Sequence, residues 1–308
     1  SLTILGLVIL TLAADKLVEG AAGLARRFGI SPLVVGLTIV ATGTSAPELV
    51  VSIQASIAHN PGISVGNVVG SNIFNIAAIL GLAAMISPIT CSRAVIRRDL
   101  PIMIGTAGLC WFMARDLLFD RAECLGLLFL FISYTAISIY LARKHPEEAP
   151  AAEATPSVST LTGELVRIVL GLVALIWGAD LLLNNSIALA KGFGISDEVI
   201  GLTLVAAGTS MPELATSIMA ARRGQPDIAI GNIVGSNIFN ILGILGIAGM
   251  ILPLQVSEHM LTKDLPLMLG VSLACLPIMR SDWRISRLEG VFLFSLYVAY
   301  TALLIKGW

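Results

Sequence analysis

Two glutamates occupy equivalent places in two copies of one apolar motif. Glu48 lies in TIVATGTSAPELVVS, residues 38–52, and Glu213 lies in TLVAAGTSMPELATS, residues 203–217. By insertion scales, an acidic side chain at the centre of a bilayer costs on the order of 2.5 to 3.5 kcal/mol. A structural ion pair would need basic partners at similar depth, and Lys16 is the only candidate inside a predicted span. We therefore expect the glutamates to bind a cation from solution.

A proline precedes each glutamate and should interrupt the helix that carries it. Pro47 and Pro212 lack an amide hydrogen and disturb the carbonyls about one turn earlier, near Thr44 and Thr209. Irregular backbone persists in hydrocarbon only where it is buried in protein or lines a cavity. A plain proline kink is the alternative. The adjacent glutamate favours carbonyl groups that face a bound ion.

A second motif is also duplicated. GNVVGSNIFNIAAILG, residues 66–81, returns as GNIVGSNIFNILGILG, residues 231–246. Each copy carries a serine and an asparagine four residues apart, on one helical face, and a GxxxG pair that allows close helix approach. The polar faces consist of Ser71 with Asn75 and Ser236 with Asn240. We expect them beside the glutamates; simple hydrogen bonding between helices is the alternative.

The donor set that these motifs assemble contains only oxygen. Ca²⁺ takes about six to eight oxygen ligands in a flexible shell, and two bidentate carboxylates with two carbonyls already supply about six. The three histidines fall between the predicted spans and the four cysteines are scattered, which argues against zinc or copper. No cofactor is expected.

The composition places the chain in a membrane. Of 308 residues, 56% are hydrophobic and 13% are charged, whereas soluble proteins carry roughly 25% charged residues. A helix of roughly 17 to 25 apolar residues crosses the hydrocarbon core. The net charge of −1 gives no indication of a nucleic-acid partner. The fold class expected is all-α integral membrane, with ten spans at about 2–25, 33–58, 64–88, 99–114, 122–142, 163–190, 198–221, 229–253, 264–280 and 288–306.

The two halves of the chain repeat with an offset of 165, the difference between 213 and 48. Five spans in each half is an odd number, so the repeats should have inverted topology, with broken helices 2 and 7. That pattern is typical of secondary transporters with a binding site near the midplane. The divisions expected are a first repeat at 1–142, a Pro-rich and Glu-rich cytoplasmic linker at 143–160 and a second repeat at 161–308.

The distribution of lysine and arginine predicts the orientation. With the N-terminus outside, thirteen basic residues fall on the cytoplasmic side and five outside; with Lys16 they make up all 19. We therefore expect both termini outside. Because Asp15 and Asp180 match across the repeat, the first span is expected to be a permanent helix and not a signal peptide.

GTSAPE, GTSMPE and the paired GNxVGSNIFN segments resemble the α1 and α2 repeats of the cation/calcium exchanger superfamily, particularly the prokaryotic sodium/calcium exchangers. The resemblance covers essentially the whole chain. It implies an antiporter of a prokaryotic plasma membrane in which helices 1 and 6 slide across a core made by the other eight. A single chain should suffice, and the partners are Na⁺, Ca²⁺ and the bilayer.

The resemblance also implies ligands for each ion. Calcium is expected between Glu48 and Glu213, with the carbonyls of Thr44 and Thr209. The sodium sites use the carbonyls of Ala41 and Ala206, the hydroxyls of Ser71 and Ser236 and the same glutamates, and Asn75 and Asn240 take the central position. Sodium and calcium would then compete for shared carboxylates. Potassium-dependent relatives carry aspartate where Asn240 stands, which disfavours potassium co-transport here.

Several alternatives stay open. Protons could replace sodium as the counter-ion, and a passive cation channel would use the same oxygen ligands. An intramembrane protease would need Ser45 or Ser210 as nucleophile, or Asp15 and Asp180 as a catalytic pair, but no histidine lies within a span to act as base. The two aspartates could otherwise form a second ion site or a gate, although hydrogen bonding to a neighbouring helix end is favoured. Asp99 and Asp264 are predicted to be helix N-caps.

Overall fold

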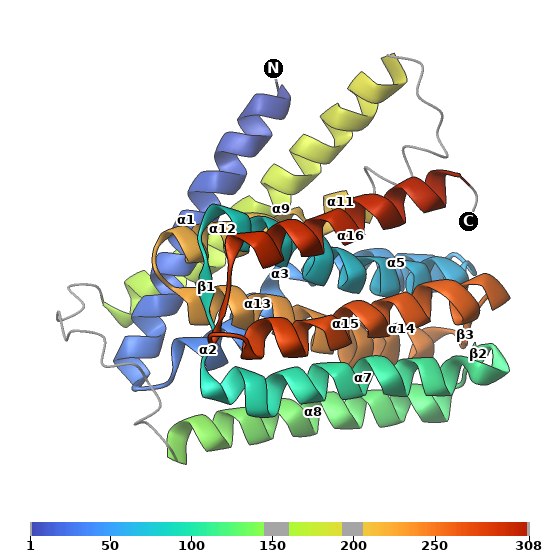
Figure 1. The fold of residues 1–308 in the computed structure, drawn as a ribbon. Helices are drawn as coiled ribbons and strands as arrows, with labels where there is room; N and C mark the ends of the chain where they lie inside the picture. Colours follow the sequence, from blue (N-terminus) through green and yellow to red (C-terminus); the bar gives the residue numbers. More distant parts are fainter. Residues whose placement is uncertain (1, 145–159, 193–205, 307–308) are drawn as a thin grey trace.

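The fold is a bundle of long helices. The computed structural model describes residues 2–144, 160–192 and 206–306. Most of the predicted linker and the first part of the span predicted at 198–221 lie outside these ranges. Figure 1 shows α1 and α9 side by side and inclined to the helices that make up the rest of the bundle.

The first half begins with α1 and continues into a helix interrupted at Ser45. The break separates α3 from α4, and the segments on its two sides are bent by 45° relative to each other. The elements of this half are α1 (Leu2–Phe28), α2 (Pro32–Val35), η1 (Gly36–Val40), α3 (Ala41–Thr44), α4 (Ala46–Ile57), α5 (Pro61–Ile73), η2 (Phe74–Leu80), α6 (Gly81–Ile86), β1 (Ile89–Thr90), η3 (Val95–Asp99), α7 (Leu100–Met113), η4 (Ala114–Asp116), β2 (Leu118–Phe119) and α8 (Arg121–Lys144).

The second half follows the same order where it is described. Its break falls at Ser210, between α11 and α12. The elements are α9 (Leu161–Gly192), α11 (Ala206–Thr209), α12 (Met211–Arg222), α13 (Pro226–Phe239), η7 (Asn240–Leu245), α14 (Gly246–Ile251), β3 (Leu254–Gln255), η8 (Met260–Asp264), α15 (Leu265–Arg280), β4 (Arg284–Ile285) and α16 (Arg287–Ile305).

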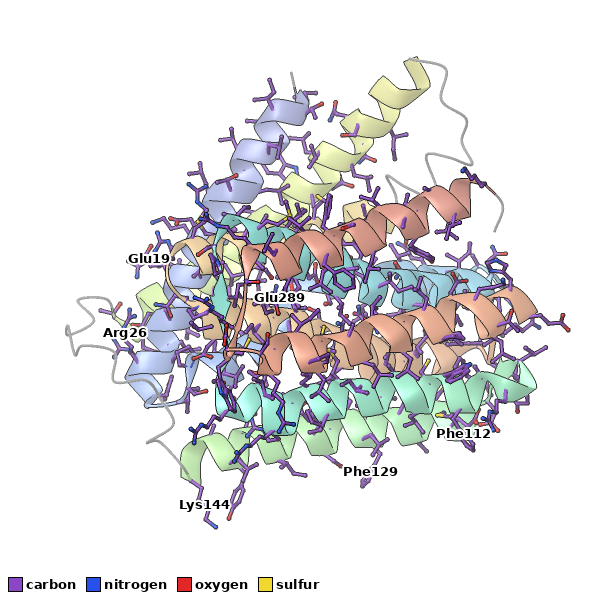
Figure 2. The ribbon with its side chains drawn as sticks, in the orientation of Figure 1. Glu19, Arg26, Phe112, Phe129, Lys144 and Glu289 are labelled. Carbon is purple, nitrogen blue, oxygen red and sulfur yellow. The ribbon has the colours of Figure 1, made fainter. Side chains whose placement is uncertain are left out.

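The described residues contain at least six helical segments long and apolar enough to cross a membrane, or seven if the bent pair at 32–57 is one span. Two of them form the centre. The apolar windows of 61–86 and 226–251 are 78% and 89% buried inside the protein, compared with 22% for that of 121–142. Figure 2 shows Phe112 and Phe129 projecting outward from the bundle, and their exposure of 62% and 69% suits a surface covered by lipid.

The two halves contact each other reciprocally. The short strands β1 and β3 begin at Ile89 and Leu254, one repeat offset apart. Each pairs antiparallel with a strand of the other half, β1 with β4 and β3 with β2. Equivalent segments therefore exchange equivalent partners across the molecule.

The second GxxxG pair brings α13 close to an interrupted helix, as predicted, and the structure shows that this helix belongs to the first half. A Cβ atom at Gly235 would lie 2.5 Å from the carbonyl oxygen of Leu37, and one at Gly231 would lie 2.7 Å from that of Leu33. Only glycine allows this approach. Among the described residues, Gly66 and Gly70 have no contact as close.

The predicted N-caps at Asp99 and Asp264 are wrong. Both residues have helical backbone angles and neither side chain caps its helix, because the π-helical turns η3 and η8 run directly into α7 and α15. Their carboxylates bind side chains instead. Asp99 pairs with Arg98, and Asp264 accepts a hydrogen bond of 2.9 Å from Tyr300.

Candidate functional site

The two breaks deliver both glutamates to the buried centre. Glu48 lies in the first turn of α4 and Glu213 in the first turn of α12, each three residues after the serine at its break. Both side chains are fully buried. The prolines stand where a helix begins, so the missing amide hydrogen leaves no gap in the hydrogen bonding of the new helix. The sequence thus places each carboxylate at a helix N-terminus inside the protein.

Each carboxylate is held by the serine at the opposite break. Ser210 Oγ donates a hydrogen bond of 2.7 Å to Glu48 Oε1. In reciprocal fashion, Ser45 Oγ donates one of 2.7 Å to Glu213 Oε1, and it also lies 3.0 Å from Ser236 Oγ. These contacts join residues far apart in the chain, so the centre is built from both halves.

Seven buried side-chain oxygens in the two duplicated motifs have no hydrogen-bond partner among the described residues. An unpaired buried acceptor typically costs about 1 to 3 kcal/mol, and more if it is charged. Such a concentration in one region is what a cation site needs, because a cation satisfies acceptors that have no donor. The oxygens are Glu48 Oε2, Glu213 Oε2, Ser71 Oγ, Asn75 Oδ1, Asn240 Oδ1, Thr209 Oγ1 and Thr216 Oγ1.

The carboxylates supply only part of any ligand set. In the part of the chain that the structure describes, no group of three or more His, Cys, Asp or Glu side chains could hold a metal ion. A cation bound by Glu48 and Glu213 must therefore be completed by hydroxyl, amide and carbonyl oxygens. Hard cations such as Ca²⁺ accept such ligands.

The other predicted ligands differ in the hydrogen bonds that they already make within the protein. The Ala41 carbonyl accepts from the backbone N–H of Ser45 at 3.1 Å and from the hydroxyl of Ser236 at 3.4 Å. The hydroxyl of Thr44 donates to Asn232 Oδ1 at 3.0 Å. Ala206 is the first described residue of α11, in the same short helix as Thr209.

Two asparagines that sequence reasoning did not assign support the breaks. Asn67 Nδ2 donates to the Glu48 carbonyl at 3.0 Å and to Ser52 Oγ at 3.0 Å. Its counterpart Asn232 donates to the Glu213 carbonyl at 3.3 Å and to the equivalent serine hydroxyl at 2.9 Å. The signal for both was the near identity of the duplicated motifs at their polar positions, where only two differ: Thr42 is matched by Ala207, and Thr216 stands where the first half has Val51.

Comparison with known proteins identifies the family. A sequence profile described as "Sodium/calcium exchanger protein" matches residues 1–140 and 164–306. The chain belongs to this family. The matched ranges include both duplicated motifs and the glutamates that they carry.

Relatives of the exchanger family align along nearly the whole chain. The putative antiporter CaxA of Alkalimonas amylolytica is 39% identical, and the alignment covers 99% of this chain and 98% of that protein. The sodium/calcium exchanger MaX1 of Methanosarcina acetivorans is 36% identical, with 98% and 97% covered. A structure of the sodium-calcium exchanger NCX_Mj soaked with Na⁺ and Sr²⁺ is 32% identical, with 98% and 96% covered and a TM-score of 0.85.

Membership of the exchanger family makes the chain a multi-pass membrane protein and a cation/Ca²⁺ antiporter rather than an enzyme. The protease alternative is wrong, and its candidate nucleophiles have another role in the structure. Both serine hydroxyls donate to glutamate carboxylates.

Asp15 in α1 and Asp180 in α9, which match across the repeat, bond to residues other than the two buried glutamates. Asp15 forms an ion pair with Arg223, which follows the C-terminal end of α12. Asp180 accepts a hydrogen bond of 3.0 Å from Asn184, one turn further along α9. Bonding to neighbouring groups, and to a helix end in the case of Asp15, agrees with the interpretation favoured from the sequence.

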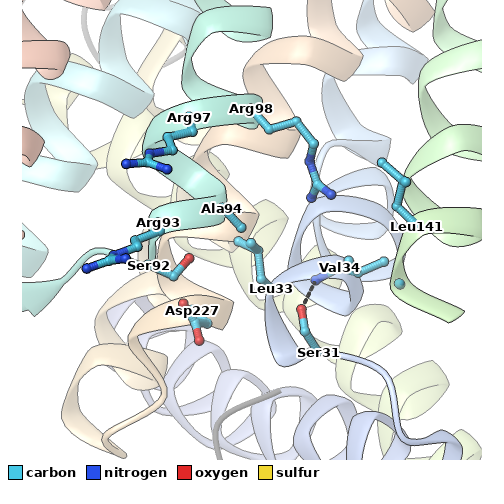
Figure 3. Close-up of a pocket in the computed structure, with 11 residues that line it drawn as sticks. Ser31, Leu33, Val34, Ser92, Arg93, Ala94, Arg97, Arg98, Leu141 and Asp227 are labelled. Carbon is cyan, nitrogen blue, oxygen red and sulfur yellow. Dashed lines mark hydrogen bonds between the residues drawn. The ribbon is translucent and has the colours of Figure 1, made fainter. Parts of the chain in front are cut away.

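A cavity of about 610 Å³ elsewhere in this exchanger-family chain does not suit a cation. Figure 3 shows Arg93, Arg97 and Arg98 along one side of it, with Ser31 and Asp227 on the facing elements. Arg98 is paired with Asp99, but Arg93 and Arg97 still outnumber the one lining carboxylate, Asp227, so the net positive charge disfavours a cation. The buried glutamates, each with an oxygen that lacks a partner among the described residues, are the better candidate site for a cation.

Proposed function

We propose that this chain exchanges Na⁺ for Ca²⁺ across the membrane by alternating access, with both ions competing for one carboxylate site. The observation that carries the proposal is the arrangement of Glu48 and Glu213. Each has one oxygen held by a serine of the opposite half and one buried oxygen without a partner among the described residues. The named relatives MaX1 and NCX_Mj, both sodium/calcium exchangers, support the same pair of ions.

Competition explains how exchange would be coupled. Ca²⁺ needs both carboxylates to reach about six to eight oxygen ligands. Several Na⁺ ions would take the same carboxylate oxygens, so the protein would bind one kind of ion at a time. A carrier that changes orientation only when loaded then moves Na⁺ one way and Ca²⁺ the other.

We assign the ligands as follows. Calcium takes Glu48, Glu213 and the carbonyls of Thr44 and Thr209. Sodium takes the carbonyls of Ala41 and Ala206 and the hydroxyls of Ser71 and Ser236, together with the glutamates. Asn75 and Asn240 line the centre with their buried carbonyl oxygens, which supports a role as neutral ligands.

The proposed architecture is ten helices in two inverted repeats, 1–142 and 161–308, joined by a cytoplasmic linker, with both termini outside a prokaryotic plasma membrane. The reciprocal contacts of the two halves support a two-fold relationship. Pairs of glycines support motion of α1 with α9 as one unit. A Cβ at Gly6 would lie 2.9 Å from the backbone nitrogen of Leu182, and one at Gly178 would lie 3.1 Å from that of Leu10.

The deciding experiment is uptake of calcium-45 into proteoliposomes. Vesicles loaded with Na⁺ are compared with K⁺-loaded and acid-inside vesicles at equal ionic strength. We expect uptake only with internal Na⁺. Uptake driven by the proton gradient alone would replace Na⁺ by H⁺ as counter-ion, and uptake regardless of the internal cation would make the protein a channel.

A further inference from the structure

Two asparagines meet at the contact between the central helices. Asn72 in α5 and Asn237 in α13 are one repeat offset apart and are each only 1% exposed. Asn72 Nδ2 lies 3.4 Å from the backbone carbonyl oxygen of Asn237. Equivalent residues that touch each other lie close to the axis relating the two halves.

These residues bind the amide nitrogens of the two asparagines beside the cation site, and they do so crosswise. Asn240 Nδ2 donates to Asn72 Oδ1 at 3.0 Å. Asn75 Nδ2 donates to Asn237 Oδ1 at 3.3 Å. Each bond therefore joins one half of the chain to the other, and each uses the only strong acceptor of the receiving amide.

Two methionine sulfurs support this amide orientation. Asn72 Nδ2 lies 3.7 Å from Met268 Sδ, and Asn237 Nδ2 lies 3.5 Å from Met103 Sδ. A thioether sulfur accepts weakly and cannot donate. If either amide were turned over, its carbonyl oxygen would face sulfur and its NH₂ group would face another NH₂ group. Both new contacts would be unfavourable.

This arrangement leaves the side-chain oxygens of Asn75 and Asn240 without a hydrogen-bond donor from the described part of the chain. With their nitrogens engaged, both Oδ1 atoms are buried and have no donor among the described residues. Both residues stand at π-helical segments, η2 and η7, and π-bulges within helices are frequent at functional sites. An amide turned the other way would present its positive NH₂ edge to a cation and repel it.

We propose that Asn72 and Asn237 are positioning residues, which orient Asn240 and Asn75 so that their carbonyl oxygens face the cation. This inference rests on the proposed cation site at the glutamates and extends it to two residues that need not touch the ion. It explains why buried amides with an unpaired oxygen are tolerated at the centre of the protein. It also predicts a specific pairing, Asn72 with Asn240 and Asn237 with Asn75.

The test uses aspartate, because a carboxylate presents oxygen whichever way it turns. Asn72→Ala is made in the wild type and in Asn240→Asp and Asn75→Asp backgrounds. Two quantities are measured: the KM for calcium-45 uptake, and the Ca²⁺ concentration that half-saturates the rise in melting temperature. The second reports cation binding without reference to the counter-ion.

Asn72→Ala is expected to raise both values by about tenfold in the wild type, the size expected for one hydrogen bond. The increase should persist in Asn75→Asp and fall below about threefold in Asn240→Asp. For Asn237→Ala, the increase should persist in Asn240→Asp and fall below about threefold in Asn75→Asp. Equal effects in both backgrounds would overturn the proposal in favour of a packing role. If uptake needs no Na⁺ but the crossed binding pattern holds, the proposed exchange fails and the positioning role stands.

Discussion

Ser45, at the break in the first half, donates a hydrogen bond of 2.7 Å to Glu213, at the break in the second half. Ser210 and Glu48 form the mirrored contact at the same distance. A movement of either break therefore changes the surroundings of the carboxylate on the other. These reciprocal hydrogen bonds are a physical route by which a site shared by the two halves can respond to movement of either half.

Removing either serine hydroxyl should weaken calcium binding. A hydrogen bond to a charged group typically contributes about 1.5 to 3 kcal/mol, so Ser45→Ala and Ser210→Ala should each raise the KM for calcium uptake by about 10-fold to 100-fold. Ser56→Ala is a matched control, because Ser56 is a buried serine of α4 that contacts Ser64 rather than a glutamate. An unchanged KM in both break variants would contradict the assigned role.

Neutralising either glutamate should abolish exchange without unfolding the protein. Glu48→Gln and Glu213→Gln keep the side-chain shape and remove the charge that a divalent cation requires. Initial rates of Na⁺-dependent calcium uptake should fall to background, while melting in detergent stays cooperative. Glu258→Gln changes an exposed glutamate and should have no effect. Wild-type rates in either buried variant would refute the site.

Replacing Gly235 by alanine should destabilise the protein. The added Cβ would lie 2.5 Å from the carbonyl oxygen of Leu37, and backbone cannot yield as a flexible side chain can. Overpacking typically costs about 1 to 3 kcal/mol, so the melting temperature in detergent should fall clearly. Gly126→Ala in α8 is the control, since no described atom lies within 4 Å of its added Cβ. Equal melting temperatures for the two variants would show that α13 and η1 separate readily.

Removing the charge of Asp15 should have little effect on calcium affinity. Its partner Arg223 is 37% exposed at the side chain, and exposed ion pairs contribute about 0 to 1 kcal/mol. The KM of Asp15→Asn should therefore stay within about threefold of the wild-type value, and Asp180→Asn should behave in the same way. Loss of exchange in either variant, with the protein still folded, would assign that aspartate to an ion site or a gate.

Predictions from residue types within one segment succeeded where that segment alone decides the local structure. Pro47 and Pro212 placed both breaks within two residues of where the structure has them, because a missing amide hydrogen acts on its own helix. The same rules failed at Asp99 and Asp264. An aspartate before a proline is a good N-cap only if the helix begins there, and here the preceding π-helical turn already carries the chain into the helix.

The sequence by itself determined the membrane class, the repeat, the two breaks and the candidate oxygen donors, since each depends on residue types and their spacing along the chain. The repeat offset matched Ser45 with Ser210 and Asn72 with Asn237. Only the tertiary structure decided which of these residues touch. The serine of one half binds the glutamate of the other, and the axial asparagines set which edge of Asn75 and Asn240 is left unpaired. Equivalence along a sequence cannot show this, because contact between halves depends on how two packed surfaces meet in space.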